Sequence, residues 1–181
     1  MMRQILIIKV IVVLFIFASP LLAQQNDFIK EYLERFENSH RYLIEVANAM
    51  PEEKYDFKAT QESLSFAESL MHIGYAMDWH TQSLLGVRKS RDWNTDTRYN
   101  VGTKTKKEII KVVDDTFQET IAYIKQFNTT QFNEKLDYFG LNRTKLQIFL
   151  LLADHITHHR GQILVYLRLN GVVPPRYVLY Q

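Results

Sequence analysis

The sequence contains no cysteine, and it has only six glycines and four prolines. Without cysteine, the chain cannot form a disulfide bond or use a thiolate of its own. The remaining composition, with 46% hydrophobic and 13% aromatic residues, is ordinary for a globular protein. A chain of 181 residues can bury one sizeable core. We therefore expect a single domain that is stabilised by side-chain packing.

Basic residues are not in excess over acidic ones either when residues 1–23 are left out. Residues 1–23 contain Arg3 and Lys9 and no acidic residue, so the rest of the chain has 20 basic residues against 20 acidic ones. Nucleic-acid-binding proteins usually carry a basic surplus that neutralises phosphates. We therefore expect no nucleic-acid partner and, for any activity, a small-molecule substrate.

Residues 1–23 have the pattern of a signal peptide. Two basic residues precede the uncharged run 10–18, and a cleavage position follows Ala23. A membrane anchor needs about 20 consecutive apolar residues, and this run is shorter. We expect residues 24–181 to form the mature domain, which is exported to the periplasm or secreted and has no stable membrane span. An uncleaved anchor is the alternative.

Apolar residues recur at steps of three and four over three segments, as on amphipathic helices. The first segment begins at Asn26 and is stopped by Pro51. The second runs from Ser65 to Gly86 and starts with the Ser-x-x-Glu spacing of a capping box. In the third, apolar residues recur over 110–124, after a polar loop without periodicity. Each segment predicts a helix.

A last helix is predicted from Asn142 to Asn170, because Gly171 and then two prolines follow it as stop signals. The segment before it has only a weak hairpin or turn signal at residues 137–140, and no run is a convincing strand. Four helices without an internal repeat predict an all-α four-helix bundle. In such a bundle, sites are built from side chains that point inward from neighbouring helices.

His155 and His159, in the segment ADHITHHRGQ, are the first candidates for a metal site. Four residues on a helix correspond to about 40° and about 6 Å, so both imidazoles project from one face. The same face carries apolar residues such as Ile148 and Ile163, which places the pair towards the bundle interior. Burying unpartnered imidazoles costs roughly 1–3 kcal/mol each, and a shared metal ion removes that cost. Two hydrogen-bonded core histidines are the alternative.

A catalytic zinc site usually has a third protein ligand, and His72 is the best candidate. It lies on the second predicted helix between the small residues Ser69 and Ala76, which leave space for an ion and its water. The sequence therefore predicts a three-histidine metal site formed by His72, His155 and His159.

The other three histidines have different interpretations. His158 is three residues from His155, so spacing alone allows it to replace His159 as the partner. His80 lies in an apolar row and is interpreted as a core-edge histidine with one hydrogen bond. His40 is flanked by polar residues and is expected to be exposed.

Neighbouring polar residues have orienting or structural interpretations. Asp78, Asp154 and Gln162 could orient an imidazole through its second nitrogen, and Gln162 is three residues beyond the last candidate ligand. Arg160 is interpreted as a helix-surface residue or a member of an interhelical salt bridge, and Gly161 as a site of close helix packing.

The pattern excludes several chemistries. In H-E-x-x-H zinc proteases a glutamate follows the first histidine as general base, whereas Ile156 follows His155 here. The Glu-x-x-His pairs of di-iron bundles, a P-loop and a dinucleotide fingerprint are also absent. What remains is one divalent ion on three neutral imidazoles, which keeps its full charge and can lower the pKa of bound water towards about 7. Because no general base is identified, a structural ion is the non-catalytic alternative.

The segments SLMHIGYAMDWHTQSLLG and DHITHHRGQILVYLRLNG together resemble the DinB/YfiT-like family of bacterial metal-binding four-helix bundles. The likeness covers nearly the whole predicted mature chain, and the H-x-x-H-H-R-G-Q form is its most specific part. The resemblance implies a single Zn²⁺ or Ni²⁺ ion bound by His72, His155 and His159. It thereby leaves His158 outside the ligand set.

The resemblance also implies a class of activity. Family members with a defined activity are similar to metal-dependent hydrolases, or to transferases and isomerases that activate a low-molecular-weight thiol on the metal. Such thiols are mainly cytoplasmic, so the predicted signal peptide favours a metal-dependent hydrolase. A thiol transferase or isomerase, an exported bundle with a structural metal and a metal-free interaction protein are the alternatives. A homodimer through a helix face is left open.

Overall fold

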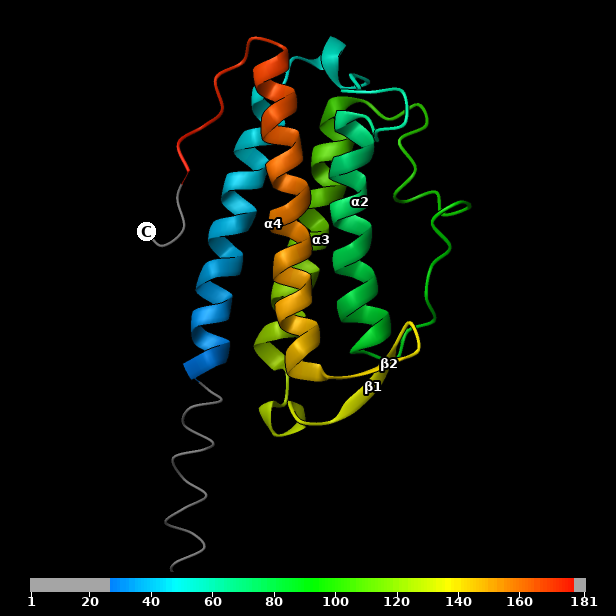
Figure 1. Ribbon diagram of the computed structural model, residues 1–181, viewed down its shortest axis with the longest axis vertical. Coiled ribbons are helices and arrows are strands. Elements are labelled where there is room, and N and C mark those ends of the chain that lie inside the picture. The colour runs from blue at the N-terminus through cyan, green and yellow to red at the C-terminus, as the bar shows by residue number, and fades with distance from the viewer. Residues whose placement is uncertain (1–26, 178–181) are drawn as a thin grey trace, which may run out of the picture.

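The computed structural model describes residues 27–177 as a bundle of four helices (Figure 1). The first helix spans residues 27–49. The others are α2 (Phe66–Asp78), α3 (Lys106–Gln126) and α4 (Lys145–Leu169), and the short 3-10 helices η1 (Glu52–Lys54) and η3 (Thr129–Gln131) lie in the connections. The four predicted helices are therefore confirmed. The predicted signal peptide, residues 1–23, lies outside the described residues.

A capping box begins each of α2, α3 and α4. At α2, the hydroxyl of Ser65 accepts a hydrogen bond from the backbone N–H of Glu68, and the Glu68 carboxylate accepts one from the backbone N–H of Ser65. Thr105 and Thr144 cap α3 and α4 in the same way. Each box satisfies backbone N–H groups that have no partner within the helix, so these residues fix where the helices start.

A two-stranded β-hairpin precedes α4, and it differs from the all-α prediction. β1 (Lys135–Tyr138) pairs antiparallel with β2 (Leu141–Thr144). The turn residues Phe139 and Gly140 have positive φ values of 54° and 80°, as a two-residue hairpin turn requires. The weak hairpin signal in the sequence is therefore confirmed, and the two short strands add to the predicted all-α bundle. Because residues 141–144 form β2, α4 begins at Lys145 and not at the predicted Asn142.

The second helix changes type part of the way along. α2 ends at Asp78 and continues as a π-helix, η2 (Trp79–Leu84), where one regular helix was predicted. The side chains of His80 and Thr81 each bond to the carbonyl four residues earlier, and such bonds compete with regular helical pairing. The backbone N–H of Leu85 then pairs with the carbonyl of His80, five residues earlier. These bonds account for the change in helix type.

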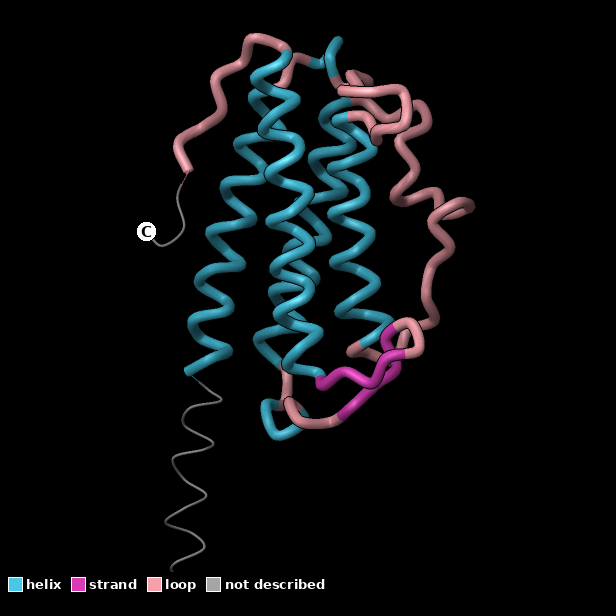
Figure 2. Tube along the Cα trace, in the orientation of Figure 1, coloured by secondary structure: helices cyan, strands magenta, loops and turns pink. Residues whose placement is uncertain are grey.

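The connection formed by residues 85–105 sets the direction of the helices. It runs along the outside of the bundle from one end to the other, so α2 and α3 point the same way (Figures 1 and 2). The first helix lies against α4, where the Tyr32 hydroxyl donates to the Phe149 carbonyl, and against α3, where His40 bonds to Asp114. α2 contacts both α3 and α4. The fold thereby places α2 and α4 side by side.

The four helices share one hydrophobic core. Large aromatic side chains such as Phe66, Phe117 and Phe149 are fully buried in it, and burial of each stabilises the fold by roughly 1.5–3 kcal/mol. Apolar surface is thus used for packing between the helices. Within residues 27–177, no helix combines the length and the apolar character that crossing a membrane requires.

Candidate metal centre

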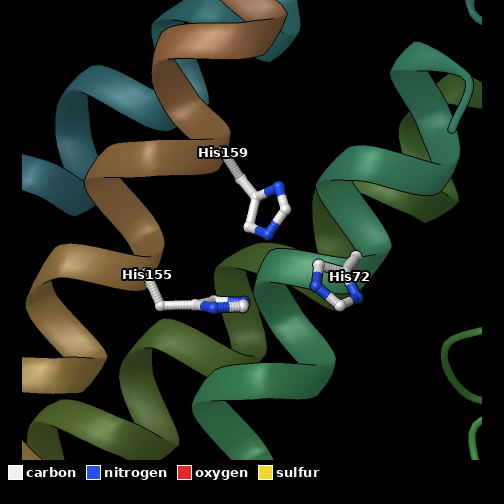
Figure 3. A group of neighbouring side chains, drawn as sticks. All are labelled: His72, His155 and His159. Carbon is white, nitrogen blue, oxygen red and sulfur yellow. The ribbon is translucent and has the colours of Figure 1, made fainter. Parts of the chain in front are cut away.

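Three histidines meet between α2 and α4 (Figure 3). His72 projects from α2, His155 and His159 project from α4, and the three rings point toward one another. One ligand nitrogen from each lies within 4.8 Å of the other two. The ring centroids are 4.5 Å apart for His72 and His159 and for His155 and His159, and 5.1 Å apart for His72 and His155. This three-histidine cluster could hold a metal ion.

Burial keeps the imidazoles of the cluster neutral. Desolvation, together with the nearby His159, lowers the pKa of His72 to about 4. Desolvation, followed by the effect of the neighbouring histidines, lowers the pKa of His155 to about 3. The pKa of His159 is also lowered, again mainly by desolvation. At neutral pH each ring therefore carries an unprotonated nitrogen, the form that binds a metal ion.

A hydrogen bond fixes the proton position on His159. Its Nδ1 donates to Oε1 of Gln162 over 2.8 Å, so Nε2 keeps a free lone pair. The amide nitrogen of Gln162 also contacts Nε2 of His158 at 3.2 Å. Gln162 is therefore confirmed as a partner of an imidazole, and one nitrogen of His158 is taken up by this bond.

The donor set suits a divalent ion. Nε2 of His155 is buried and has no hydrogen-bond partner among the residues that the structure describes. Leaving a buried polar atom unpaired costs roughly 1–3 kcal/mol, and a cation beside this atom would remove that cost. The cluster found within residues 27–177 contains no carboxylate. Three neutral nitrogen ligands are a set that Zn²⁺ and Ni²⁺ accept, so the residues fit such an ion.

The other three histidines lie outside the cluster. His158 is exposed. His80 is buried with one hydrogen bond, from Nδ1 to the carbonyl of Ala76 at 2.7 Å, as predicted. His40 was wrongly expected to be exposed: its side chain is 13% exposed, and its Nε2 lies 2.6 Å from Oδ1 of Asp114. Its partner is on α3, which the local sequence could not indicate.

The two aspartates that were considered as orienting groups have other environments. Asp78 is buried and forms ion pairs with Arg88 and Arg91. Asp154 is exposed on α4, and no hydrogen bond joins it to an imidazole among the described residues. Neither aspartate therefore orients the cluster in this structure.

Arg160 and Gly161 both differ from their predicted roles. Arg160 is only 4% exposed, and its guanidinium lies over the rings of Tyr42 and Tyr177. Within the described part of the chain it forms no salt bridge. Gly161 is exposed, and a Cβ atom there would meet nothing within 4 Å. Close helix packing at this glycine was therefore a wrong expectation.

The connection between η2 and α3 adds a residue that was missed. The ring of Trp93 meets His72 edge-on at a centroid distance of 5.5 Å, and it also contacts Tyr75 at 5.1 Å. The Tyr75 hydroxyl donates to the carbonyl of Arg91 over 2.7 Å, which holds this part of the connection against α2. The single tryptophan of this mostly polar segment is the sequence signal that could have identified it.

The fold and the site define a class: helical bundles in which three histidines from two helices could hold one metal ion. A sequence model of the DinB family matches residues 23–180, and the chain belongs to this family. The protein YjoA of Bacillus subtilis (strain 168) is 24% identical over 154 residues, which cover 83% of this chain and 93% of YjoA.

Two solved structures share the fold. A DinB-like protein from Bacillus cereus ATCC 10987 matches with a TM-score of 0.65 and 16% identity, over 81% of this chain and 95% of that one. The DinB-like YjoA structure from Bacillus subtilis matches with a TM-score of 0.61 and 19% identity, over 83% and 98% of the two chains. At these identities the likeness shows the fold alone.

Proposed function

We propose that the protein is a metal-dependent hydrolase whose single divalent ion is bound by His72, His155 and His159. The observation that carries this proposal is the buried, unpartnered Nε2 of His155 beside two other neutral imidazoles. Zn²⁺ or Ni²⁺ suits this ligand set. When bound, such an ion supplies Lewis-acid chemistry to a water molecule or to a substrate oxygen.

The surrounding residues support this role. Gln162 holds the proton of His159 on Nδ1, so Nε2 is available to the ion. The edge of the Trp93 ring packs against His72, with the ring centroids 5.5 Å apart. His80 donates its Nδ1 proton to the Ala76 carbonyl, and its ring centroid lies 6.1 Å from that of His155.

The hydrolase proposal includes an exported protein that acts on a small molecule. The pattern of residues 1–23 supports export to the periplasm or secretion. Export argues against a transferase or isomerase that depends on a cytoplasmic thiol. The balance of 20 basic and 20 acidic residues after residue 23 argues against a nucleic-acid substrate.

An open coordination position distinguishes a catalytic ion from a structural one. The test is to load the protein with Co²⁺, record its visible spectrum, and add acetohydroxamate or 2-mercaptoethanol in separate titrations. We expect acetohydroxamate to change the spectrum, because a catalytic site keeps a position for an exogenous ligand. If neither probe changes the spectrum, the ion is structural and the hydrolase proposal fails. If only the thiol changes it, a thiol-dependent reaction replaces hydrolysis.

A further inference from the structure

The three histidines of the candidate metal centre are held in different ways. His159 donates its Nδ1 proton to Gln162 over 2.8 Å. The ring of His155 lies between those of His159, at a centroid distance of 4.5 Å, and His80, at 6.1 Å. His72 has no hydrogen bond to any group in the described part of the chain. A metal-binding histidine usually has a partner that fixes the plane of its ring, so another contact must orient His72.

The two acidic side chains of α2 are not available to His72. Glu68 lies four residues before it, but the Glu68 carboxylate accepts a hydrogen bond from the backbone N–H of Ser65 over 2.7 Å. The same carboxylate lies 3.3 Å from the ammonium group of Lys58. Asp78, at the end of α2, is buried and forms ion pairs with two arginines of the connection that follows η2. Both carboxylates are thus held by other partners.

Trp93 is in contact with the ring of His72. The two ring centroids are 5.5 Å apart, and the ring planes are nearly perpendicular, at 88°. Such an edge-to-face arrangement is a preferred geometry for aromatic rings. Rotation of the imidazole about its Cβ–Cγ bond would disturb this arrangement. The contact with Trp93 therefore favours one orientation of the ring.

The backbone on both sides of Trp93 is fixed. On one side, the Tyr75 hydroxyl donates to the carbonyl of Arg91 over 2.7 Å, and the rings of Tyr75 and Trp93 are 5.1 Å apart. On the other side, Oδ1 of Asp92 accepts a hydrogen bond from the backbone N–H of Asn94 over 2.9 Å, which forms a turn around Trp93. A ligand is positioned precisely when its neighbours are themselves held in place. Trp93 meets this condition.

We propose that Trp93 is a positioning residue for His72. Its ring keeps the imidazole turned toward His155 and His159 (Figure 3), as the hydrogen bond to Gln162 does for His159. An indole is a donor only and offers no lone pair to a cation, so Trp93 acts through His72 and not as a ligand. This role rests on the proposed function, whose metal site the connection between η2 and α3 then helps to form.

The orientation of His72 can be measured in the metal-free protein. The ring centroids of His72 and His159 are 4.5 Å apart, so a nuclear Overhauser effect (NOE) between their ring protons is expected in the wild type. The spectra of His72→Ala and His159→Ala assign the two rings. In Trp93→Ala the NOE should be lost, because the imidazole of His72 is free to rotate. In Trp93→Phe, which keeps an aromatic ring, it should remain.

The affinity for Zn²⁺, measured by competition with a chelator, is the second readout. Trp93→Ala should weaken binding by about 10- to 100-fold, the loss typical of an orienting partner, and Trp93→Phe should retain most of the affinity. Trp79→Ala is the matched control. Trp79 is half-buried like Trp93, but its ring contacts Tyr138 and Phe139 of the hairpin, and no ring contact joins it to a ligand among the described residues. Trp79→Ala should keep both the NOE and the affinity.

A wild-type NOE or a wild-type Zn²⁺ affinity in Trp93→Ala overturns the proposal, and so does an equal loss in Trp79→Ala. If Trp93→Ala does not fold, Trp93→Leu, which keeps much of the apolar volume, replaces it with the same expected losses. If the wild-type protein binds no Zn²⁺, the hydrolase proposal fails, and the NOE comparison alone decides the role of Trp93.

Discussion

α4 carries polar groups on two different faces. The face toward α2 holds His155 and His159, whereas Arg160 is buried against the first helix. Successive residues of an α-helix are turned by about 100°, so the neighbours His159 and Arg160 enter different environments. Histidine responds to burial by losing its proton, as the lowered pKa values of His155 and His159 indicate. Arginine remains charged.

The two faces of α4 differ in the charge that they present. The histidine face presents neutral nitrogen atoms with lone pairs, which attract a cation. The arginine face holds a fixed positive charge that hydroxyl groups and aromatic rings partly stabilise. Substitutions on the arginine face should therefore leave metal binding unaffected.

The largest effect is expected for His155→Ala. Removing the ligand whose Nε2 is buried and unpartnered should weaken the binding of Zn²⁺ by more than about 100-fold, because losing even an orienting partner costs about 10- to 100-fold. His158→Ala is the matched control, since His158 is exposed and, within residues 27–177, its hydrogen bond is to Gln162. Competition with a chelator of known affinity measures both. Equal losses in the two variants would contradict the assignment of the ligands.

Acid should destabilise the metal-free protein through the histidine face. The pKa values of about 4 for His72 and about 3 for His155 lie below the ordinary value of 6.5, so the unfolded chain binds protons that the folded chain does not. The free energy of unfolding should therefore be constant above about pH 6.5 and fall as the pH drops towards 4 and 3. Arg160 does not titrate in this range. Urea unfolding as a function of pH checks this expectation, and an equal slope in His155→Phe would contradict it.

A smaller effect is expected for Gln162→Leu. The leucine cannot accept the hydrogen bond from Nδ1 of His159, so the orientation and proton position of that ligand are lost. Metal affinity should fall by about 10- to 100-fold. Gln162→Glu keeps an acceptor oxygen at the same position and should retain most of the affinity. Chelator competition on both variants separates the effect of the hydrogen bond from the effect of side-chain size. Wild-type affinity in Gln162→Leu would exclude the orienting role.

The smallest effect is expected for Gly161→Ala, at an exposed position of α4. A methyl group there has open space, and alanine favours the helix over glycine. The substitution should raise the free energy of unfolding by about 0.4–1 kcal/mol and leave metal affinity unchanged. Chemical denaturation measures the stability. A loss of stability would show that a neighbouring element approaches this face.

Much of the fold could be predicted from local signals in the sequence. The Ser65 and Glu68 pair marks the start of α2, and helical spacing explains how His155 and His159 share a face. The meeting of His72 with that pair could be predicted because inward-facing side chains of neighbouring bundle helices converge. These features depend on a few residues along one helix or on a general rule of bundles.

Features that depend on contacts between distant segments could not be predicted in this way. His40 is covered by α3, Arg160 is covered by the segment that follows α4, and Trp93 reaches His72 from a long connection. The π-helix η2 depends on side chains that compete for backbone carbonyls, which periodicity does not reveal. Burial of a polar residue is thus decided by its tertiary partner, and a single sequence does not name that partner.

Elemental analysis of the purified protein is the most direct test of the metal assignment. After expression with Zn²⁺ and Ni²⁺ available, we expect one divalent ion per wild-type chain, close to one in His158→Ala and close to none in His155→Ala. A correctly folded wild-type protein that contains no stoichiometric divalent metal would contradict it.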